Sequence, residues 1–262
     1  MGLFDKKFCD ICGEKIGLLG NRKLEDGNLC KNCAAKLSPW FSDRRASTVQ
    51  QIKDQLDYRE ENRAAAAAFH TTRSFGKNVK LLQDEDAKKF TVTSASNLAE
   101  ANPDILDYAQ VTGCDIEIDE DRDEMKRKDA DGKMVSYNPP RYEYAYDFYA
   151  TIYVNHPYFD DMRFKLNPSQ VETGESPMGG AKGFTVIKPG MIGAAPRGVT
   201  EYNEFVKMGN EIKEAVDAMR QGVRDKIEEA NAPRPSVICP CCGATTKPGP
   251  DGCCEFCGGP VG

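Results

Sequence analysis

Four Cys-x-x-Cys pairs, two near each end, constrain the fold of this chain more than any other feature. Two cysteines separated by two residues can turn both sulfurs toward one ion, and two such pairs supply the four ligands of a structural zinc site. Seventeen residues separate the N-terminal pairs and eleven separate the C-terminal pairs. The predicted zinc ligands are Cys9, Cys12, Cys30 and Cys33 at the first site, and Cys239, Cys242, Cys254 and Cys257 at the second.

Disulfides and redox-active dithiols are the alternatives to zinc. Disulfides suit small secreted proteins, and the opening MGLFDKKFCD has no apolar stretch of signal-peptide length. A redox pair belongs beside a strand–helix unit, which neither end offers. We therefore expect two structural zinc ions per chain, because four thiolates leave no coordination position for water. We also expect a cytoplasmic protein, because no signal peptide is evident and the paired cysteines suit zinc better than disulfides. No run of about 18 apolar residues could span a membrane.

The last twenty-four residues, from Cys239 to Gly262, hold six cysteines and few apolar residues. So short a segment cannot bury enough apolar surface to fold alone, whereas a metal can contribute about 10–16 kcal/mol to such a module. We predict a zinc ribbon here. Cys241 and Cys253 break the two-residue spacing and are interpreted as non-ligands, with spare ligands or oxidation-prone thiols as the alternative. Phe256 is either an exposed contact residue or packed on the zinc loop.

A helix is predicted to follow the N-terminal finger, from about residue 48 to the mid-60s. Ser47 and Gln50 match a capping box, and apolar residues then recur at helical spacing. The polar residues around 59–63 are expected to face solvent. Within the finger, three residues are expected to pack on the apolar segment IGLLG at 16–20. They are Leu37, Trp40 and Phe41.

The segment CDICGEKIGLLGNRKLEDGNLCKNCAAKLSPWF, followed by STVQQIKDQLDYREEN, resembles an uncharacterised zinc-binding domain family of bacterial proteins, a domain of unknown function. The resemblance covers about residues 8–62. It implies zinc binding at the first four cysteines and implies no known catalytic activity. The C-terminal CPCCGATTKPGPDGCCEFCG resembles zinc ribbons appended to many bacterial cytoplasmic proteins, some of them linked to envelope stress.

The middle of the chain is predicted to form a mostly antiparallel sheet of six or seven strands, covered by a long helix. YEYAYDFYATIYV is the clearest strand, and NVKLLQDEDAKKFTVT reads as a hairpin. An apolar stripe at three- and four-residue intervals marks the helix. Its residues are Tyr202, Phe205, Ile212, Val216, Met219, Val223 and Ile227. Strands followed by one helix are similar to pleckstrin-homology-like folds, and a helix that bundles with a partner is the competing use of the stripe.

Three tempting motifs lack the residues that their chemistry needs. DEDRDEMKRKDAD has acids at calcium-loop spacing but has Glu124 where the loop needs Gly and Ala130 where it needs Glu, so a mobile charged hairpin loop is expected. GGAKGF lacks the Gly-Lys-Ser/Thr of a phosphate loop. Neither His70 nor His156 lies in a recognisable catalytic arrangement, and Cys114 is expected to be a buried thiol.

These features predict an α+β protein of four segments. They are a zinc finger at 1–46, a connecting helix at 47–74, a β domain with its helix at 75–232, and a linker with the zinc ribbon at 233–262. The predicted function is a non-enzymatic zinc-binding adaptor or scaffold that binds unknown protein partners, with peripheral membrane association left open. A nucleic-acid-binding regulator is the alternative, disfavoured by a net charge of −6. An enzyme with a site on the sheet is the second alternative.

Overall fold

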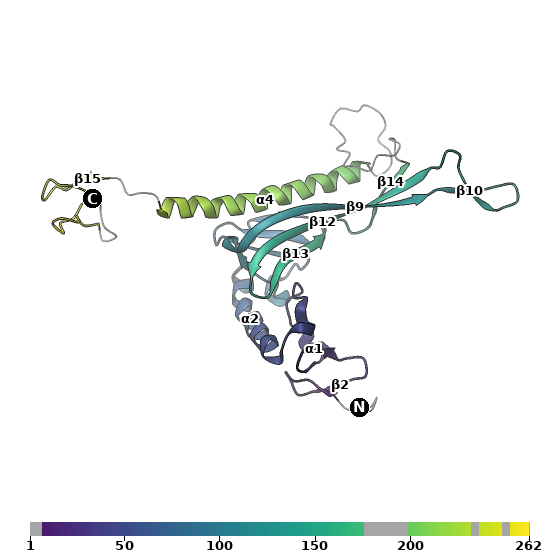
Figure 1. Ribbon diagram of the computed structural model, residues 1–262, viewed down its shortest axis with the longest axis horizontal. Coiled ribbons are helices and arrows are strands. Elements are labelled where there is room, and N and C mark those ends of the chain that lie inside the picture. The colour runs from purple at the N-terminus through teal and green to yellow at the C-terminus, as the bar shows by residue number, and fades with distance from the viewer. Residues whose placement is uncertain (1–6, 176–198, 232–235, 248–251, 262) are drawn as a thin grey trace. The chain divides into compact units, whose positions relative to one another are not determined.

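The computed structural model describes residues 7–175, 199–231, 236–247 and 252–261 (Figure 1). It shows the predicted mixture of helices and antiparallel sheets, with a long helix late in the chain and four clustered cysteines near each end. The chain divides into two compact units, Met1–Arg220 and Gln221–Gly262. The GGAKGF motif and the two prolines at 233 and 235 lie outside the described residues. Among the described helices, none is long and apolar enough to cross a bilayer.

The N-terminal finger consists of two short hairpins and one helical turn. Its elements are β1 (Lys7–Phe8), β2 (Lys15–Ile16), β3 (Arg22–Lys23), β4 (Asn28–Leu29) and α1 (Lys31–Ala34). The apolar residues of its core include Ile16, Leu24, Leu29, Leu37 and Phe41. The expected packing of the IGLLG segment therefore holds for its isoleucine alone. Leu18 and Leu19 are almost fully exposed, as the central residues of a turn closed by Gly17 and Gly20, and Trp40 is not among the core residues.

Helix α2 (Val49–Ala68) begins one residue later than its sequence pattern predicted. The capping box joins Thr48 and Gln51, with the Gln51 side chain accepting the Thr48 N–H at 2.8 Å. Ser47 instead follows the short helix η1 (Asp43–Ala46) and donates its hydroxyl to the Asp43 carbonyl. Ser47–Gln50 and Thr48–Gln51 both match the pattern, so the residue types alone do not distinguish the two starts.

The face of α2 that packs against the rest of the unit is largely polar, which corrects the expectation that Arg59 faces solvent. Its buried residues recur every three or four positions and are Ile52, Gln55, Arg59, Asn62 and Ala66. The Arg59 guanidinium forms a salt bridge of 2.8 Å with Asp104, whose side chain is fully buried. Arg59 also donates to the carbonyls of Asn102 and Lys36. This one side chain therefore connects the finger, the helix and a loop of the β domain.

Neighbouring polar side chains complete the same buried network. Ser38 donates its hydroxyl to Asp104 at 2.9 Å, and the Tyr58 hydroxyl donates to the other oxygen of that carboxylate at 3.1 Å. The Asn62 amide donates to the Pro103 carbonyl at 2.7 Å and accepts the Ile105 N–H at 2.9 Å. Because buried polar groups are costly unless paired, this network fixes one arrangement of helix and loop.

The β domain contains two four-stranded antiparallel sheets rather than the single sheet expected. The first sheet follows the chain in the order β5 (Arg73–Phe75), β6 (Lys80–Asp84), β7 (Lys89–Thr93) and β8 (Leu106–Asp107). The short helices α3 (Leu98–Ala101) and η2 (Tyr108–Gln110) flank β8. In the second sheet β12 (Tyr142–His156) pairs along its length with β9 (Val111–Glu124). It also pairs with β13 (Phe159–Lys165) and β14 (Val171–Glu175).

The acidic segment expected to be a loop is mostly strand. Asp119 to Glu124 belong to β9 and pair with β12, where the Arg122 guanidinium lies 4.4 Å from the centre of the Tyr142 ring. The chain reverses only at 129–133, between β10 (Lys126–Lys128) and β11 (Met134–Ser136). Pairing with a complete neighbouring strand thus imposes β structure on residues that favour turns.

Within the first unit, helix α4 (Val199–Asn231) lies along the second sheet (Figure 1). Alternating residues of β12 were predicted to share one face of the strand. Four of them are buried: Phe148, Ala150, Ile152 and Val154. Phe205 stacks on Phe148 with 5.5 Å between ring centres. Gly209 allows close approach, since a Cβ there would lie 2.8 Å from Ile116. In the predicted stripe of α4, the residues from Phe205 to Met219 are buried, Tyr202 is half-buried, and Ile227 in the second unit is exposed.

Candidate metal centres

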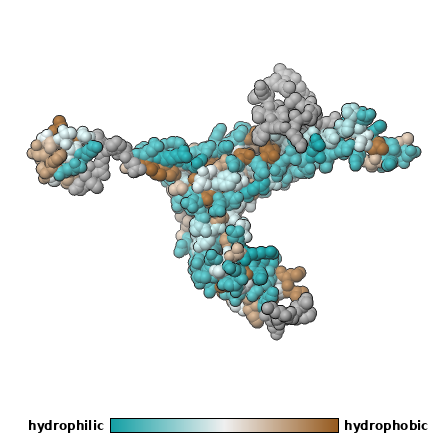
Figure 2. All heavy atoms as spheres, in the orientation of Figure 1, coloured by the Kyte–Doolittle hydropathy of each residue, from teal (hydrophilic) through white to brown (hydrophobic). Residues whose placement is uncertain are grey.

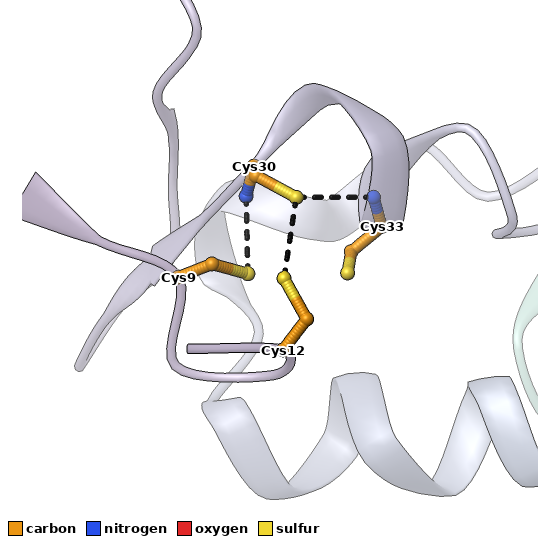
Figure 3. A group of neighbouring side chains, drawn as sticks. All are labelled: Cys9, Cys12, Cys30 and Cys33. Carbon is orange, nitrogen blue, oxygen red and sulfur yellow. Dashed lines mark hydrogen bonds between the residues drawn. The ribbon is translucent and has the colours of Figure 1, made fainter. Parts of the chain in front are cut away.

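The four cysteines of the first quartet come from a turn and from the start of a helix (Figure 3). Cys9 and Cys12 lie on the turn after β1, where Gly13 donates its N–H to the Cys9 carbonyl and has φ +74°. Cys30 is the N-cap of α1 and Cys33 lies inside that helix. The helix needs no residue of positive φ after Cys33, which explains why Ala34 stands where the other three knuckles have glycine. The four sulfurs lie within 4.8 Å of one another.

Backbone N–H groups prepare this quartet to carry negative charge. The Cys30 N–H donates to the Cys9 sulfur at 3.3 Å, and the Cys33 N–H donates to the Cys30 sulfur at 3.3 Å. Burial raises the pKa of Cys9, but N–H donors from Cys12, Cys30 and Ile11 outweigh it and lower that pKa to about 7. Burial and the neighbouring sulfurs raise the pKa of Cys33. Backbone donors thus favour the thiolate of Cys9, and a bound cation would offset the factors that disfavour the thiolate of Cys33.

The second quartet repeats one knuckle twice, in a module that includes β15 (Val237–Ile238) and β16 (Thr245–Thr246). Gly243 donates its N–H to the Cys239 carbonyl at 2.8 Å, and Gly258 donates to the Cys254 carbonyl at 2.9 Å. Both glycines have positive φ, as the sequence predicts. Burial raises the pKa of Cys254, but N–H donors from Cys257 and Phe256 outweigh it and lower that pKa to about 6.

The spacing of the sulfurs fits a tetrahedral ion better than a disulfide. A tetrahedron with zinc–sulfur bonds near 2.3 Å has sulfur–sulfur edges of about 3.8 Å. The Cys12–Cys30 sulfurs are 3.7 Å apart, and the Cys239–Cys257 and Cys242–Cys254 sulfurs are 3.6 and 3.8 Å apart. A disulfide needs about 2.0 Å, and none of the eight quartet cysteines is joined in a disulfide. Each quartet could hold one metal ion, and four soft thiolates are typical of structural zinc.

Three cysteines lie outside the quartets. Cys241 and Cys253 are not among the four sulfurs of the second group, and their interpretation as non-ligands stays a prediction. Cys114 is buried as expected, and its pKa is raised to about 11 by that burial, so the thiol is uncharged and unreactive at neutral pH.

The two histidines do not contribute to a metal site in the described part of the chain. His156 is buried against Phe159, with ring centres 4.2 Å apart, and burial lowers its pKa. His70 donates its backbone N–H to Asp84 at 3.0 Å. Both histidines therefore contact residues of the fold rather than a group of metal ligands.

Sequence reasoning missed a second kind of surface on the N-terminal finger. Four cations line a hollow beside the exposed pair Leu18–Leu19. The available signal was the run GLLGNRK, in which two leucines lie between glycines and are followed directly by basic residues. Arg44 and Arg45 also line the hollow, and nothing local in the sequence places them beside this run.

Fold and cysteine clusters together define an α+β protein with a candidate metal-binding module near each end. Residues 7–55 match the model of a protein family described as a domain of unknown function, DUF4428. The match includes the first cysteine quartet and the beginning of α2. No curated protein and no solved structure is significantly similar to the chain.

Proposed function

We propose that the chain is a non-enzymatic zinc-binding adaptor whose C-terminal ribbon docks a protein partner. The observation that carries the proposal is the ribbon's surface. Ile238 and Phe256 are 72% and 69% exposed, although the module has few apolar residues with which to build a core. Lys247 and Glu255 are the charged residues of its described part, so the surface suits a protein partner better than nucleic acid.

The metal sites support an adaptor rather than a catalyst. Four thiolates around one ion leave no position for water or substrate, so such an ion stabilises a module without activating a ligand. We propose zinc at both quartets, in a reducing compartment such as the cytoplasm, where thiols stay available for metal.

The architecture of the β domain supports the role of a scaffold. We propose a pleckstrin-homology-like arrangement, in which a four-stranded sheet is followed by a second antiparallel sheet and a covering helix. The proposed segments remain the finger at 1–46, the helix at 47–74, the β domain at 75–232 and the ribbon at 233–262. Peripheral membrane association belongs to the same proposal.

Substitution of the exposed ribbon residues tests the docking role. A full-length Ile238→Ser/Phe256→Ser variant is compared with wild type for zinc content, thermal midpoint and proteins captured from native lysate. Met134→Ser is the matched control, because Met134 is 52% exposed and lies on β11. We expect the double variant to keep its zinc and its midpoint and to lose a partner that both wild type and control retain. An unchanged partner set would refute docking through this surface.

A further inference from the structure

The turn between β2 and β3 presents two leucines to solvent. Gly20 donates its N–H to the Gly17 carbonyl at 3.0 Å, so Leu18 and Leu19 are the central residues of the turn. They are 87% and 90% exposed. Central turn positions ordinarily hold Gly, Pro, Asn or Asp, and leucine there forgoes the burial that its side chain favours. Figure 2 shows an apolar patch on the finger against a largely hydrophilic surface.

A cationic hollow of about 700 Å³ adjoins this turn. Its charged side chains are Arg22, Lys23, Arg44 and Arg45, with Glu25 as the single acid. Among the described residues, none of the four cations forms a salt bridge. The hollow therefore has a surplus of positive charge that a bound anion would neutralise.

Hydrogen bonds connect the hollow to the turn. The Arg22 guanidinium donates to the Leu19 carbonyl at 3.4 Å, and the Arg44 guanidinium donates to the Lys23 carbonyl at 3.0 Å. Burial, together with the charges of Arg22 and Arg45, lowers the pKa of Arg44. The apolar tip and the cations thus form one surface with a defined geometry.

We propose that Leu18, Leu19 and this hollow form a docking site for a lipid bilayer that carries anionic, phosphate-bearing headgroups. The leucines insert at the interface, and the cations bind the headgroups beside them. Peripheral proteins attach to membranes by this combination of apolar insertion and basic charge. A single-stranded nucleic acid site would instead pair its cations with aromatic stacking residues, and the exposed residues of this turn are aliphatic. The site deepens the membrane-associated part of the proposed function and does not depend on the ribbon.

Vesicle flotation with the full-length, zinc-loaded chain tests the site. Vesicles of phosphatidylcholine alone are compared with vesicles that also contain phosphatidylserine. The test variants are Leu18→Ser/Leu19→Ser and Lys23→Gln/Arg45→Gln, whose side chains are exposed. The matched control is Lys31→Gln/Lys36→Gln, which removes the same charge from exposed positions outside the hollow. Zinc content verifies that each variant is folded.

We expect wild type to bind only the vesicles with phosphatidylserine, and less at high salt. Each cation removed from an anionic surface costs about fivefold in affinity, so Lys23→Gln/Arg45→Gln should bind about 25-fold more weakly. The leucine variant should lose at least about tenfold because its inserted apolar area is gone. The control should retain most of the binding, and all variants should still capture the ribbon's partner.

Three results would overturn the site. One is equal vesicle binding by wild type and the leucine variant. Another is wild type that binds inorganic phosphate in the hollow but no vesicle, which would indicate a free anion as the ligand. The last is binding of a single-stranded RNA probe that only the cation variant loses, without vesicle binding, which would indicate a nucleic acid site.

Discussion

Arg59 shows what pattern reasoning can and cannot find at the scale of a residue. Its neighbours on α2 are polar, so a helical pattern places it on a solvated face. Its burial depends on Asp104, which lies 45 positions further along the chain and forms the other half of the salt bridge. No pattern in the sequence around Arg59 indicates that Asp104 will be its partner. The metal ligands are the opposite case, because two-residue spacing, followed in three of the four pairs by a glycine of positive φ, places each pair of sulfurs locally.

Arg59→Ala should destabilise the first unit by about 3–5 kcal/mol, because it leaves the fully buried Asp104 carboxylate without its cation. Urea unfolding followed by the fluorescence of Trp40, the only tryptophan, measures the change. Trp40 donates its backbone N–H to Ser38, which itself bonds Asp104, so the probe reports on this region.

Arg63→Ala is the matched control on the same helix. Its ion pair with Glu60 is exposed, at 52% and 66% of the two side chains, so the expected loss is below about 1 kcal/mol. Equal losses from Arg59→Ala and Arg63→Ala would show that the buried network does not hold α2.

At the scale of elements, single strands were predictable and their partners were not. Alternation in β12 and in β13 identified both strands, because one face of each is buried. Division into two sheets was missed, since pairing depends on contacts between segments far apart in sequence. The acidic half of β9 was missed for the same reason: its pairing with β12, not its composition, makes it a strand.

Cys239→Ser should release one zinc ion and unfold only the ribbon, because the described ribbon has a core of little more than Cys239, Cys254 and Val261. Elemental analysis measures the zinc released, and far-ultraviolet circular dichroism measures how much of the chain stays folded. Cys241→Ser is the control and should keep both ions, since its sulfur lies outside the quartet. Loss of zinc from Cys241→Ser would make that cysteine a ligand.

Chelation should unfold the finger and the ribbon but leave the β domain and most of α2 folded. The β domain has its own apolar core, and the hydrogen bonds from Arg59 and Asn62 to the segment 102–105 do not require zinc. Limited proteolysis with mass spectrometry should therefore give a protected fragment that begins within α2. Degradation of the β domain as fast as of the two ends would show that its core is not self-sufficient.

For the whole molecule, the class of fold and the existence of a cysteine module near each end follow from the sequence. The proposed docking surfaces follow from it only in part, because Phe256 alone was named as a possible exposed contact residue. These surfaces depend on which apolar residues the small modules fail to bury. On the ribbon they are Ile238 and Phe256, and on the finger Leu18 lies beside a cationic hollow. A module stabilised by metal can leave apolar residues outside, where they are free to bind other molecules.

Zinc stoichiometry tests the central claim, two closed structural metal sites on one chain, most directly. Elemental analysis of the purified full-length protein, normalised to protein concentration, should give about two zinc ions per chain, by the rule of four thiolates per ion. Titration with a thiol reagent in the native state should leave the eight ligand cysteines protected until zinc is chelated. One ion or none per chain, with those thiols reacting freely, would contradict the account.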